Sequence, residues 1–262
     1  MIQGPIQKLK SSHQASVKYT LPLGDHEIDL NSLVGTQLKM NFTGQIFCKD
    51  TGKLIRKSYG QGYSWESFIT LPECDQCIVQ PELCHYARGT CRDSAWGEKH
   101  CLQPHIIYLS LTSGLKVGIT RKSQVPTRWI DQGAVAAIKL GEVSNRLTSG
   151  LVEVEIAKKM ADKTNWRNML KNQYEEVDLL QKKQEVWSEF SDLFARHEVQ
   201  KVDDEVFTFE YPVMQYPQKV SSYNFDKNPL IEDKLMGIKG QYLIFEHGVI
   251  NMRKYQGYEI EI

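Results

Sequence analysis

Five of the six cysteines of this chain lie between Cys74 and Cys101, in the spacing C-x2-C-x6-C-x6-C-x9-C. Closely spaced thiols in an intracellular chain are more typical of a metal site than of disulfides, which are rare in reducing compartments. The simplest such site is a zinc ion bound by four thiolates. Because four protein ligands leave no open position for a substrate, we expect this zinc to be structural.

Five cysteines for four positions leave one over. The predicted ligands are Cys77, Cys84, Cys91 and Cys101, with Cys74 or one of the histidines His85, His100 and His105 as substitutes. Pro81 and the Gly89-Thr90 pair interrupt any helix here, so the sequence predicts loops and turns. A segment with so little apolar content needs a bound metal to order it. The alternative is a loop with free thiols.

The overall charge of the chain favours no class of partner. It has 262 residues, with 32 Lys+Arg balanced by 32 Asp+Glu. Nucleic-acid binding must therefore depend on a local patch. The N-terminal stretch "MIQGPIQKLKSSHQASVKYT" lacks the apolar region of a signal peptide. No stretch approaches the run of about 18 apolar residues expected of a transmembrane helix. We expect a cytoplasmic protein with no membrane partner.

The sequence on either side of the cysteines predicts the strands and helices that must position any site. Alternation at Leu38, Met40 and Phe42 predicts a strand before them. After them, two β-rich runs flank Ser113-Gly114, which predicts a β-hairpin. A short helix "PTRWIDQ" is predicted next, then a strand in "AVAAIKLGEV", then a helix with Ser149 as its N-cap.

These elements predict an α+β fold with a hairpin, helix, strand and helix at its core. We expect the terminal β-strands to form a small barrel or sheet. The predicted regions are an N-terminal β-rich part (1–70), a Cys-rich zinc-binding segment (71–104), an α/β core (105–172), an acidic helical segment (173–206) and a C-terminal β-rich part (207–262).

The order of elements in residues 105–162 resembles the core of GIY-YIG nucleases. In those enzymes a hairpin bears two tyrosines, the next helix an arginine and a later helix a metal-binding glutamate. The strings "IIY" and "KVG" stand at the two hairpin motifs here, and Arg128 lies in the short helix. Glu153 or Glu155 lies in the longer helix, and Glu153 is the better match.

The whole chain resembles a bacterial family, domain of unknown function 2797. The strings that carry this resemblance are "CHYARGTCRDSAWGEKHC", "PHIIYLSLTSGLKVGITR", "PTRWIDQGA", "KTNWRNML" and "GIKGQYLIFEHGVINMRK". The resemblance also implies an earlier pair of CxxC motifs, where this chain reads "CKDT" and "SWES". Hydroxyls are poor zinc ligands. We therefore expect that this first zinc site is lost and that Cys48 is a small buried apolar residue.

The nuclease resemblance implies a role for each of four residues. Tyr108 would help to activate water and Arg128 would stabilise charge on the phosphate. Glu153 would bind Mg²⁺ or Mn²⁺. Lys116 replaces the second tyrosine and would bind phosphate or, with a lowered pKa, act as a base. The structural alternative is that Tyr108 is ordinary strand core and that Arg128 and Glu153 are surface side chains.

Basic residues predominate between Gly114 and Arg146 and include Arg121 and Lys122, which we predict to contact nucleic acid. The favoured function is a zinc-containing protein that binds DNA or RNA, with a phosphate site of weak or no catalytic activity. The alternatives are a working metal-dependent nuclease and a protein-interaction scaffold whose zinc is purely structural.

Overall fold

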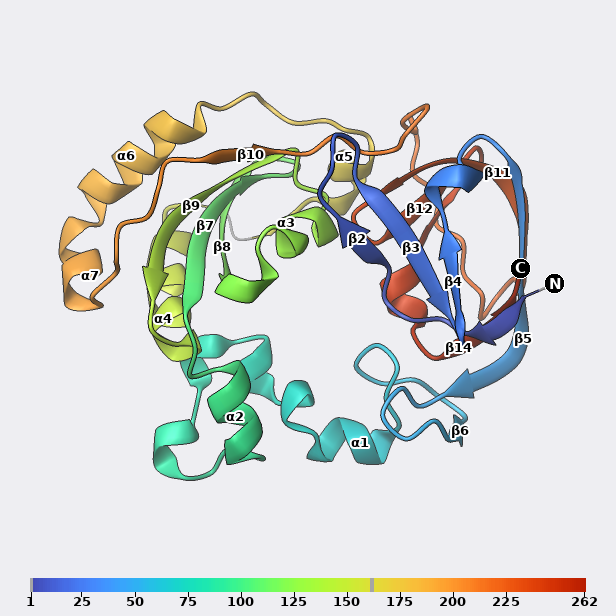
Figure 1. The fold of residues 1–262 in the computed structure, drawn as a ribbon, viewed down its shortest axis with the longest axis horizontal. Coiled ribbons are helices and arrows are strands. Elements are labelled where there is room, and N and C mark those ends of the chain that lie inside the picture. Colours follow the sequence, from blue (N-terminus) through green and yellow to red (C-terminus); the bar gives the residue numbers. More distant parts are fainter. Residues whose placement is uncertain (1, 161–162) are drawn as a thin grey trace.

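The computed structural model describes residues 2–160 and 163–262, which form a mixed α+β protein. Its strands make three antiparallel sheets, here called the terminal, N-terminal and core sheets. Figure 1 shows the core sheet and the terminal sheet on opposite sides of the molecule, with the Cys-rich segment joining them along the bottom. The expected α+β class is confirmed, and none of the described sheets closes into a barrel.

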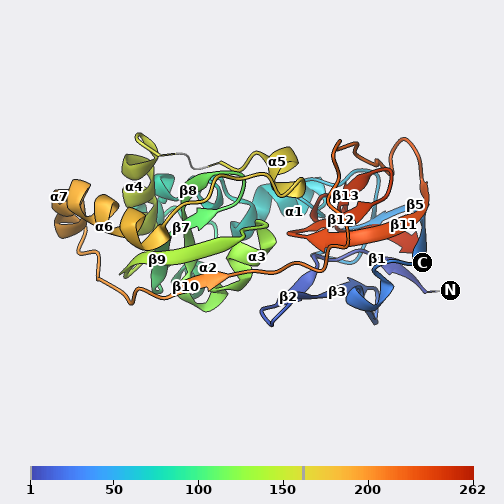
Figure 2. The ribbon, with the colours of Figure 1, turned by 90° about the horizontal axis from the view of Figure 1, so that it is seen from above.

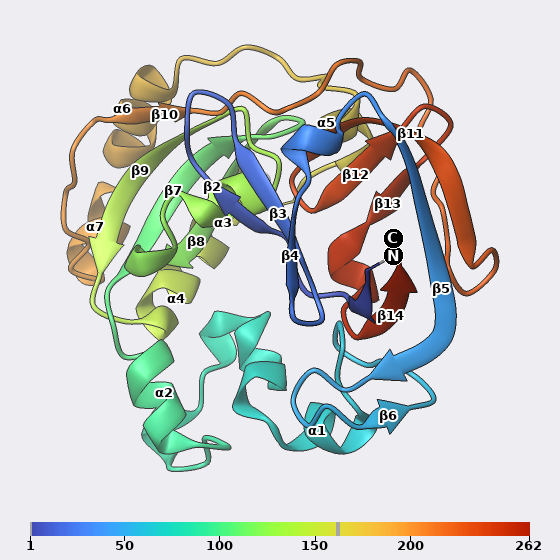
Figure 3. The same ribbon diagram turned by 45° about the vertical axis from the view of Figure 1, so that its right-hand side comes forward.

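The terminal sheet joins the two ends of the chain. Its central strand β5 (Gln37–Phe47) pairs antiparallel with β14 (Tyr258–Glu261) and with β11 (Leu230–Lys239), and runs down one side of the molecule in Figure 3. The prediction that the terminal strands share one sheet is confirmed. The barrel alternative is wrong, because the first and last strands of the order do not pair with each other. The remaining strands are β1 (Gln3–Pro5), β6 (Leu54–Ile55), β12 (Tyr242–Phe245) and β13 (Val249–Asn251).

The N-terminal sheet packs against the terminal sheet. It contains β2 (Lys10–Ser12), β3 (Lys18–Leu23) and β4 (His26–Asp29). Leu21 and Leu23 of β3 belong to the same buried cluster as Leu243 of β12. This cluster extends to Trp129 and Ile130, so the largest hydrophobic core connects the terminal half of the molecule to the core sheet.

The core sheet has the strand order β10-β9-β7-β8 and contains the predicted hairpin. Strands β7 (His105–Leu111) and β8 (Leu115–Arg121) pair in register on either side of Ser113-Gly114. The predicted strand after the short helix is β9 (Ala136–Val143). Strand β10 (Val206–Thr208) comes much later in the chain and pairs with β9, which leaves β8 as an edge strand.

Each face of the core sheet packs against different helices. Ile107 and Leu109 join a cluster with Val152 of α4 (Arg146–Ala157) and Val186 of α6 (Leu179–Glu189). The alternate side chain Tyr108 faces the other way and meets Trp129 of α3 (Thr127–Asp131) edge-on, with ring centroids 5.7 Å apart. Helices α6 and α7 (Ser191–Arg196) lie at the end of the molecule farthest from the terminal sheet (Figure 2).

Helix α4 begins three residues before the predicted N-cap. Asn145 is the cap, and its side chain accepts a hydrogen bond from the Thr148 N–H at 2.9 Å. Asn is among the strongest N-cap residues, so it begins the helix before Ser149 is reached. The remaining short helices outside the Cys-rich segment are α5 (Trp166–Leu170) and the 3-10 helices η1 (Asn31–Leu33), η6 (Lys122–Gln124) and η7 (Met252–Tyr255).

The Cys-rich segment (71–104) is built from short turns of helix. After α1 (Trp65–Thr70) come η2 (Pro72–Cys74), η3 (Gln76–Ile78), η4 (Pro81–Leu83) and η5 (Tyr86–Arg88). The prediction of loops and turns alone is wrong for α2 (Ser94–His100), where Asp93 accepts a hydrogen bond from the Trp96 N–H at 2.9 Å and caps the helix. None of the helices in the described part of the chain is long and apolar enough to cross a membrane.

Candidate functional site

A pocket of about 440 Å³ lies beside the edge strand β8. Its walls come from the hairpin, α3, α4, η3 and η4, and from two residues far apart in sequence, Lys8 and Arg253. The four residues that the nuclease resemblance singled out all line it: Tyr108, Lys116, Arg128 and Glu153. Their convergence on one pocket is therefore a property of the fold, while their chemical roles remain predictions.

Tyr108 occupies the space that a side chain at position 118 would need. The two residues are paired across the hairpin, and a Cβ on Gly118 would lie 2.6 Å from the Tyr108 hydroxyl oxygen. The buried hydroxyl donates a hydrogen bond to Gln132 Oε1 at 3.0 Å. Burial raises the pKa of Tyr108, although Arg128 opposes this shift. The phenol therefore stays protonated at neutral pH and is suited to donating a hydrogen bond rather than accepting a proton.

The pocket is strongly basic. Six basic and two acidic side chains line it, an excess of four positive charges in a chain of zero net charge. One of the acids, Asp131, forms an ion pair with Lys8 and accepts a hydrogen bond from Gln241 Nε2 at 2.8 Å. The basic residues are Lys8, Lys116, Arg121, Arg128, Arg146 and Arg253.

Three of these basic residues were missed by the sequence reasoning. Lys8 and Arg253 lie near the two ends of the chain, where no local pattern relates them to the hairpin. Arg146 was noted only as part of a basic stretch. Burial lowers the pKa of Arg253, with Arg128 adding to the effect. An arginine in this setting favours an anion that would restore the lost solvation.

Arg146 links the pocket to the Cys-rich segment. Its Nη2 donates to the Ile78 carbonyl at 2.5 Å, and its backbone N–H donates to the Cys101 carbonyl at 2.9 Å. Its buried Nε has no hydrogen-bond partner among the described residues. Burial lowers the pKa of Arg146, an effect that Cys101 opposes. Arg146 therefore lines the pocket and also contacts the Cys-rich segment.

The structure separates the two residues predicted to contact nucleic acid. Arg121 lines the pocket. Lys122 does not belong to its lining, and its exposed ammonium pairs with Glu142 at 2.8 Å. A similar separation holds on α4, where Glu153 lines the pocket while Glu155 pairs with Lys158 at 2.6 Å. Two residues apart on a helix point about 200° apart, which accounts for the difference.

The four predicted zinc ligands line a second, small cavity of about 20 Å³ between η3 and α2. Cys74 does not line it, and lies instead near Glu73 and Lys49. Cys74 is thus the cysteine of this segment that lies outside the cavity, which agrees with the predicted set but does not test it. Asp75 and His85 also line the cavity. Its cysteines are Cys77, Cys84, Cys91 and Cys101.

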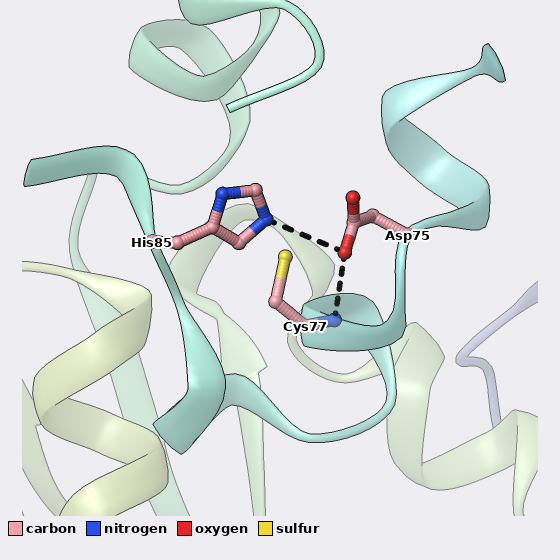
Figure 4. Close-up of side chains that lie close together, drawn as sticks. All are labelled: Asp75, Cys77 and His85. Carbon is pink, nitrogen blue, oxygen red and sulfur yellow. Dashed lines mark hydrogen bonds and ion pairs between the residues drawn. The ribbon is translucent and has the colours of Figure 1, made fainter. Parts of the chain in front are cut away.

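Asp75 is a polar neighbour of these cysteines that the sequence did not single out. The ligand atoms of Asp75, Cys77 and His85 all lie within 4.8 Å of one another (Figure 4). However, both ring nitrogens of His85 already have partners, Nε2 with Asp75 at 3.5 Å and Nδ1 with Thr90 Oγ1 at 2.9 Å. Asp75 also pairs with Arg92 Nε at 2.8 Å. Among the described residues, the four predicted thiols do not form such a group with one another, so their joint binding of zinc stays a prediction. Asp75 and His85 form a hydrogen-bonded wall beside Cys77.

The other histidines named as substitutes lie in different settings. His100 stacks on Trp96 with ring centroids 4.2 Å apart and its Nδ1 contacts the Trp96 carbonyl at 2.9 Å. His105 is fully buried, and this burial lowers its pKa to about 4. Burial, with Asp75 and the neighbouring thiols, raises the pKa of Cys77 to about 12. A divalent cation among these thiols would reverse that shift, because metal binding requires the thiolates.

The interpretation of Cys48 is half right. Its side chain is buried, as expected. Its sulfur, however, accepts a hydrogen bond from the Ser64 N–H at 3.2 Å and lies 3.5 Å from Ser67 Oγ. Burial would raise the pKa of Cys48, but these contacts and those with Thr51 outweigh it and lower the pKa to about 6. The residues of "CKDT" and "SWES" thus meet around one polar thiol.

Comparison with models of protein families gave a match over most of the chain. The family model described as a protein of unknown function, DUF2797, matches residues 35–260. Neither the curated proteins nor the solved structures contain a match to this chain. The matched range includes the core sheet, the Cys-rich segment and most of the terminal sheet.

Proposed function

The chain belongs to the DUF2797 family, and we propose that it is a zinc-containing nucleic-acid-binding protein whose GIY-YIG-like pocket holds a phosphate group. The observation that carries the proposal is the excess of four positive charges around one pocket of about 440 Å³. Arginine presents planar donors that match phosphate oxygens, and lysine adds a point charge. Electrostatic contact with phosphates is the main source of affinity in most nucleic-acid complexes.

Catalysis at this pocket is weak or absent. Tyr108 is a buried phenol with a raised pKa, so it is a poor base. Lys116 stands where the nucleases have their second tyrosine. Glu153 is the carboxylate through which Mg²⁺ or Mn²⁺ would bind, and such an ion would polarise the phosphoryl oxygens. The other acid of the pocket, Asp131, is already paired with Lys8.

A working nuclease is the second candidate. It is favoured by one observation, that Glu153 lines the same pocket as Arg128 and Tyr108. Cleavage of labelled DNA or RNA with Mg²⁺ or Mn²⁺, compared between wild type and Glu153→Gln, decides between the two. Metal-dependent cleavage that Glu153→Gln abolishes would establish the nuclease and overturn the weak-catalysis proposal.

The zinc in this proposal supports one wall of the pocket. Pro81 and Ile78 line the pocket and lie in the same segment as the cysteines. Pro81 packs so closely on α4 that a Cβ on Gly150 would lie 2.6 Å from its side chain. A zinc ion bound by Cys77 and Cys84 would hold this wall in place, because metal binding and the folding of such a segment are coupled.

The test is binding of labelled single- and double-stranded DNA and RNA by fluorescence anisotropy across a range of salt concentrations. We expect affinity to fall with salt, each neutralised phosphate adding about −0.7 to −0.9 to the log–log slope. Arg128→Gln and Arg121→Ala should weaken binding and make the slope shallower. Lys182→Ala removes the same charge on α6, where Lys182 pairs with Glu185 at 2.6 Å, and should leave binding unchanged. Absence of binding to every nucleic acid at low salt contradicts the proposal.

A further inference from the structure

The basic pocket has an apolar rim. Ile78, Val79 and Ile119 belong to its lining. Val79 is 81% exposed, the highest value among the exposed large apolar side chains in the described part of the chain. An apolar side chain held in water beside charged groups is suited to a ligand that is itself part anion and part flat apolar body. A nucleotide has this character, because its base offers an apolar face and its phosphate a charge.

The size of the pocket limits how much of a nucleic acid can enter. A volume of about 440 Å³ falls in the range of about 300–1,000 Å³ that is typical of small-molecule sites. It accommodates about one nucleotide and is far too small for a duplex. The lining comes from several directions at once, since Lys8 and Arg253 belong to the terminal half of the molecule and Val79 to the Cys-rich segment.

The charge of the pocket indicates which phosphate it takes. An internal phosphodiester carries one negative charge, whereas a phosphomonoester carries about −1.5 to −2 at pH 7. The excess of four positive charges is better matched by the monoester. Arg146, whose buried Nε has no hydrogen-bond partner among the described residues, adds a further guanidinium group to the lining of the same pocket.

We propose that the pocket takes a terminal nucleotide with its phosphomonoester, with the phosphate among Arg121, Arg128 and Arg146 and the nucleoside against Ile78 and Val79. This rests on the proposed function and narrows it to phosphorylated strand ends. A free nucleoside monophosphate offers the same chemistry. The phosphorylated strand end and the free nucleoside monophosphate differ as ligands only in whether the rest of a strand adds affinity.

The experiment compares fluorescently labelled single-stranded octamers that carry a 5′-phosphate, a 3′-phosphate or no terminal phosphate. One of the phosphorylated ends should bind about tenfold more tightly than the unphosphorylated octamer, the effect of one further strong contact. Arg121→Ala should remove most of this ratio. Lys122→Ala is the matched control, because the neighbouring lysine lies outside the pocket lining; it should keep the ratio even if affinity for all octamers falls together.

Competition separates the contribution of the nucleoside from that of the phosphate. A nucleoside monophosphate should displace the octamer at lower concentration than inorganic phosphate, and Val79→Ser should narrow this difference. Val79 is so exposed that its substitution leaves the fold intact. If the monophosphate competes as well as the phosphorylated octamer, the proposal holds with the free nucleotide as the source.

Two results would overturn the inference and are distinguishable from failure of the proposed function. Equal affinity with and without terminal phosphates, together with salt-sensitive binding, would refute recognition of ends while nucleic-acid binding stands. Equal competition by inorganic phosphate and nucleoside monophosphate would refute the role of the apolar rim. Failure of every octamer, and of duplex DNA and RNA, to bind at low salt would refute the proposed function itself.

Discussion

Tyr108 and Gly118 face each other across the β7–β8 hairpin, and the tyrosine ring fills the space directly above the glycine. A Cβ at position 118 would lie 2.6 Å from the ring, closer than such atoms approach in proteins. The glycine of "KVG" is therefore needed for space rather than for backbone freedom. It allows the Tyr108 hydroxyl to reach Gln132 at the floor of the basic pocket.

Gly118→Ala should destabilise the protein, because the buried tyrosine must move. Overpacking of this kind costs about 1–3 kcal/mol of unfolding free energy. The displaced ring should also weaken binding of the phosphorylated octamer. Urea denaturation and anisotropy measure the two effects. Gly114→Ala, in the turn of the same hairpin, meets no atom within 4 Å and should change stability by less than about 0.5 kcal/mol. Equal loss of stability in both variants would contradict the packing argument.

Purified protein should contain about one zinc ion per chain, the stoichiometry of a single four-ligand site. Cys84→Ser should lose the metal and much of the stability, because one of four ligands is removed. Cys74→Ser is the control: Cys74 lies outside the cavity of the other cysteines and its loss should leave the zinc content unchanged. Elemental analysis measures the zinc content of wild type and of both variants. Finding no metal in protein purified without chelator, or equal loss in both variants, would refute the ligand set.

Removing the zinc should also weaken anion binding. Arg146 contacts the carbonyls of Ile78 and Cys101, so disorder among the cysteines should displace it from the pocket wall. Chelation should therefore lower affinity for the phosphorylated octamer, and added zinc should restore it. Because protons compete with the metal for the thiolates, mild acid should act like the chelator. Unchanged affinity for the octamer in protein shown to be free of metal would show that anion binding in the pocket does not depend on the metal site.

The thiol of Cys48 should titrate with a midpoint of about 6. The measurement is the thiolate absorbance in the difference spectrum between wild type and Cys48→Ala. Ser67→Ala removes the contact with Ser67 Oγ at 3.5 Å and should raise the midpoint. Because the folded pKa lies below the ordinary value of 9.0, the thiolate stabilises the fold fully above pH 9 and loses this effect as the pH falls through about 6. A midpoint near 9 in wild type would contradict the hydrogen-bonded environment.

The ion pair between His247 and Asp233 should make stability depend on pH. His247 Nδ1 lies 3.0 Å from Asp233 Oδ1, and this hydrogen bond raises the pKa of His247. The pKa of Asp233 is lowered: burial opposes the shift, but hydrogen bonds from His247, Tyr223 and Lys234 outweigh it.

A raised histidine pKa stabilises the fold below about pH 6.5 and the effect is lost as the pH rises through the folded value. A lowered aspartate pKa stabilises it above about pH 3.9 and the effect is lost as the pH falls through the folded value. His247→Gln should therefore cost more stability at pH 5.5 than at pH 8.5 in urea denaturation. An equal cost at both pH values would show that the pair contributes no charge interaction.

Several features of the fold could be predicted from the sequence, because they depend on residues that are close together in it. Ser113-Gly114 between two β-rich runs specifies a hairpin, and "PTRWIDQ" specifies a short helix; both are present where the sequence placed them. The start of α4 was misplaced because two residues, Asn145 and Ser149, could each act as a cap, and the earlier one does. Helix α2 was missed because the turn-forming residues around Asp93 outweighed the cap that Asp93 itself supplies.

The sequence by itself determined the hairpin, the helix that follows it and the clustering of thiols, because turn chemistry and spacing act over a few residues. Tertiary structure alone decided the composition of the pocket. Lys8 and Arg253 reach it because β1 and β14, which lie close to them in the sequence, pair with each other in the terminal sheet. It also decided that Cys74 lies outside the cysteine cavity while Asp75 lies within it. Such contacts join residues far apart in the sequence, or place two sequence neighbours in different surroundings. They depend on how whole sheets and helices pack, which no local pattern encodes.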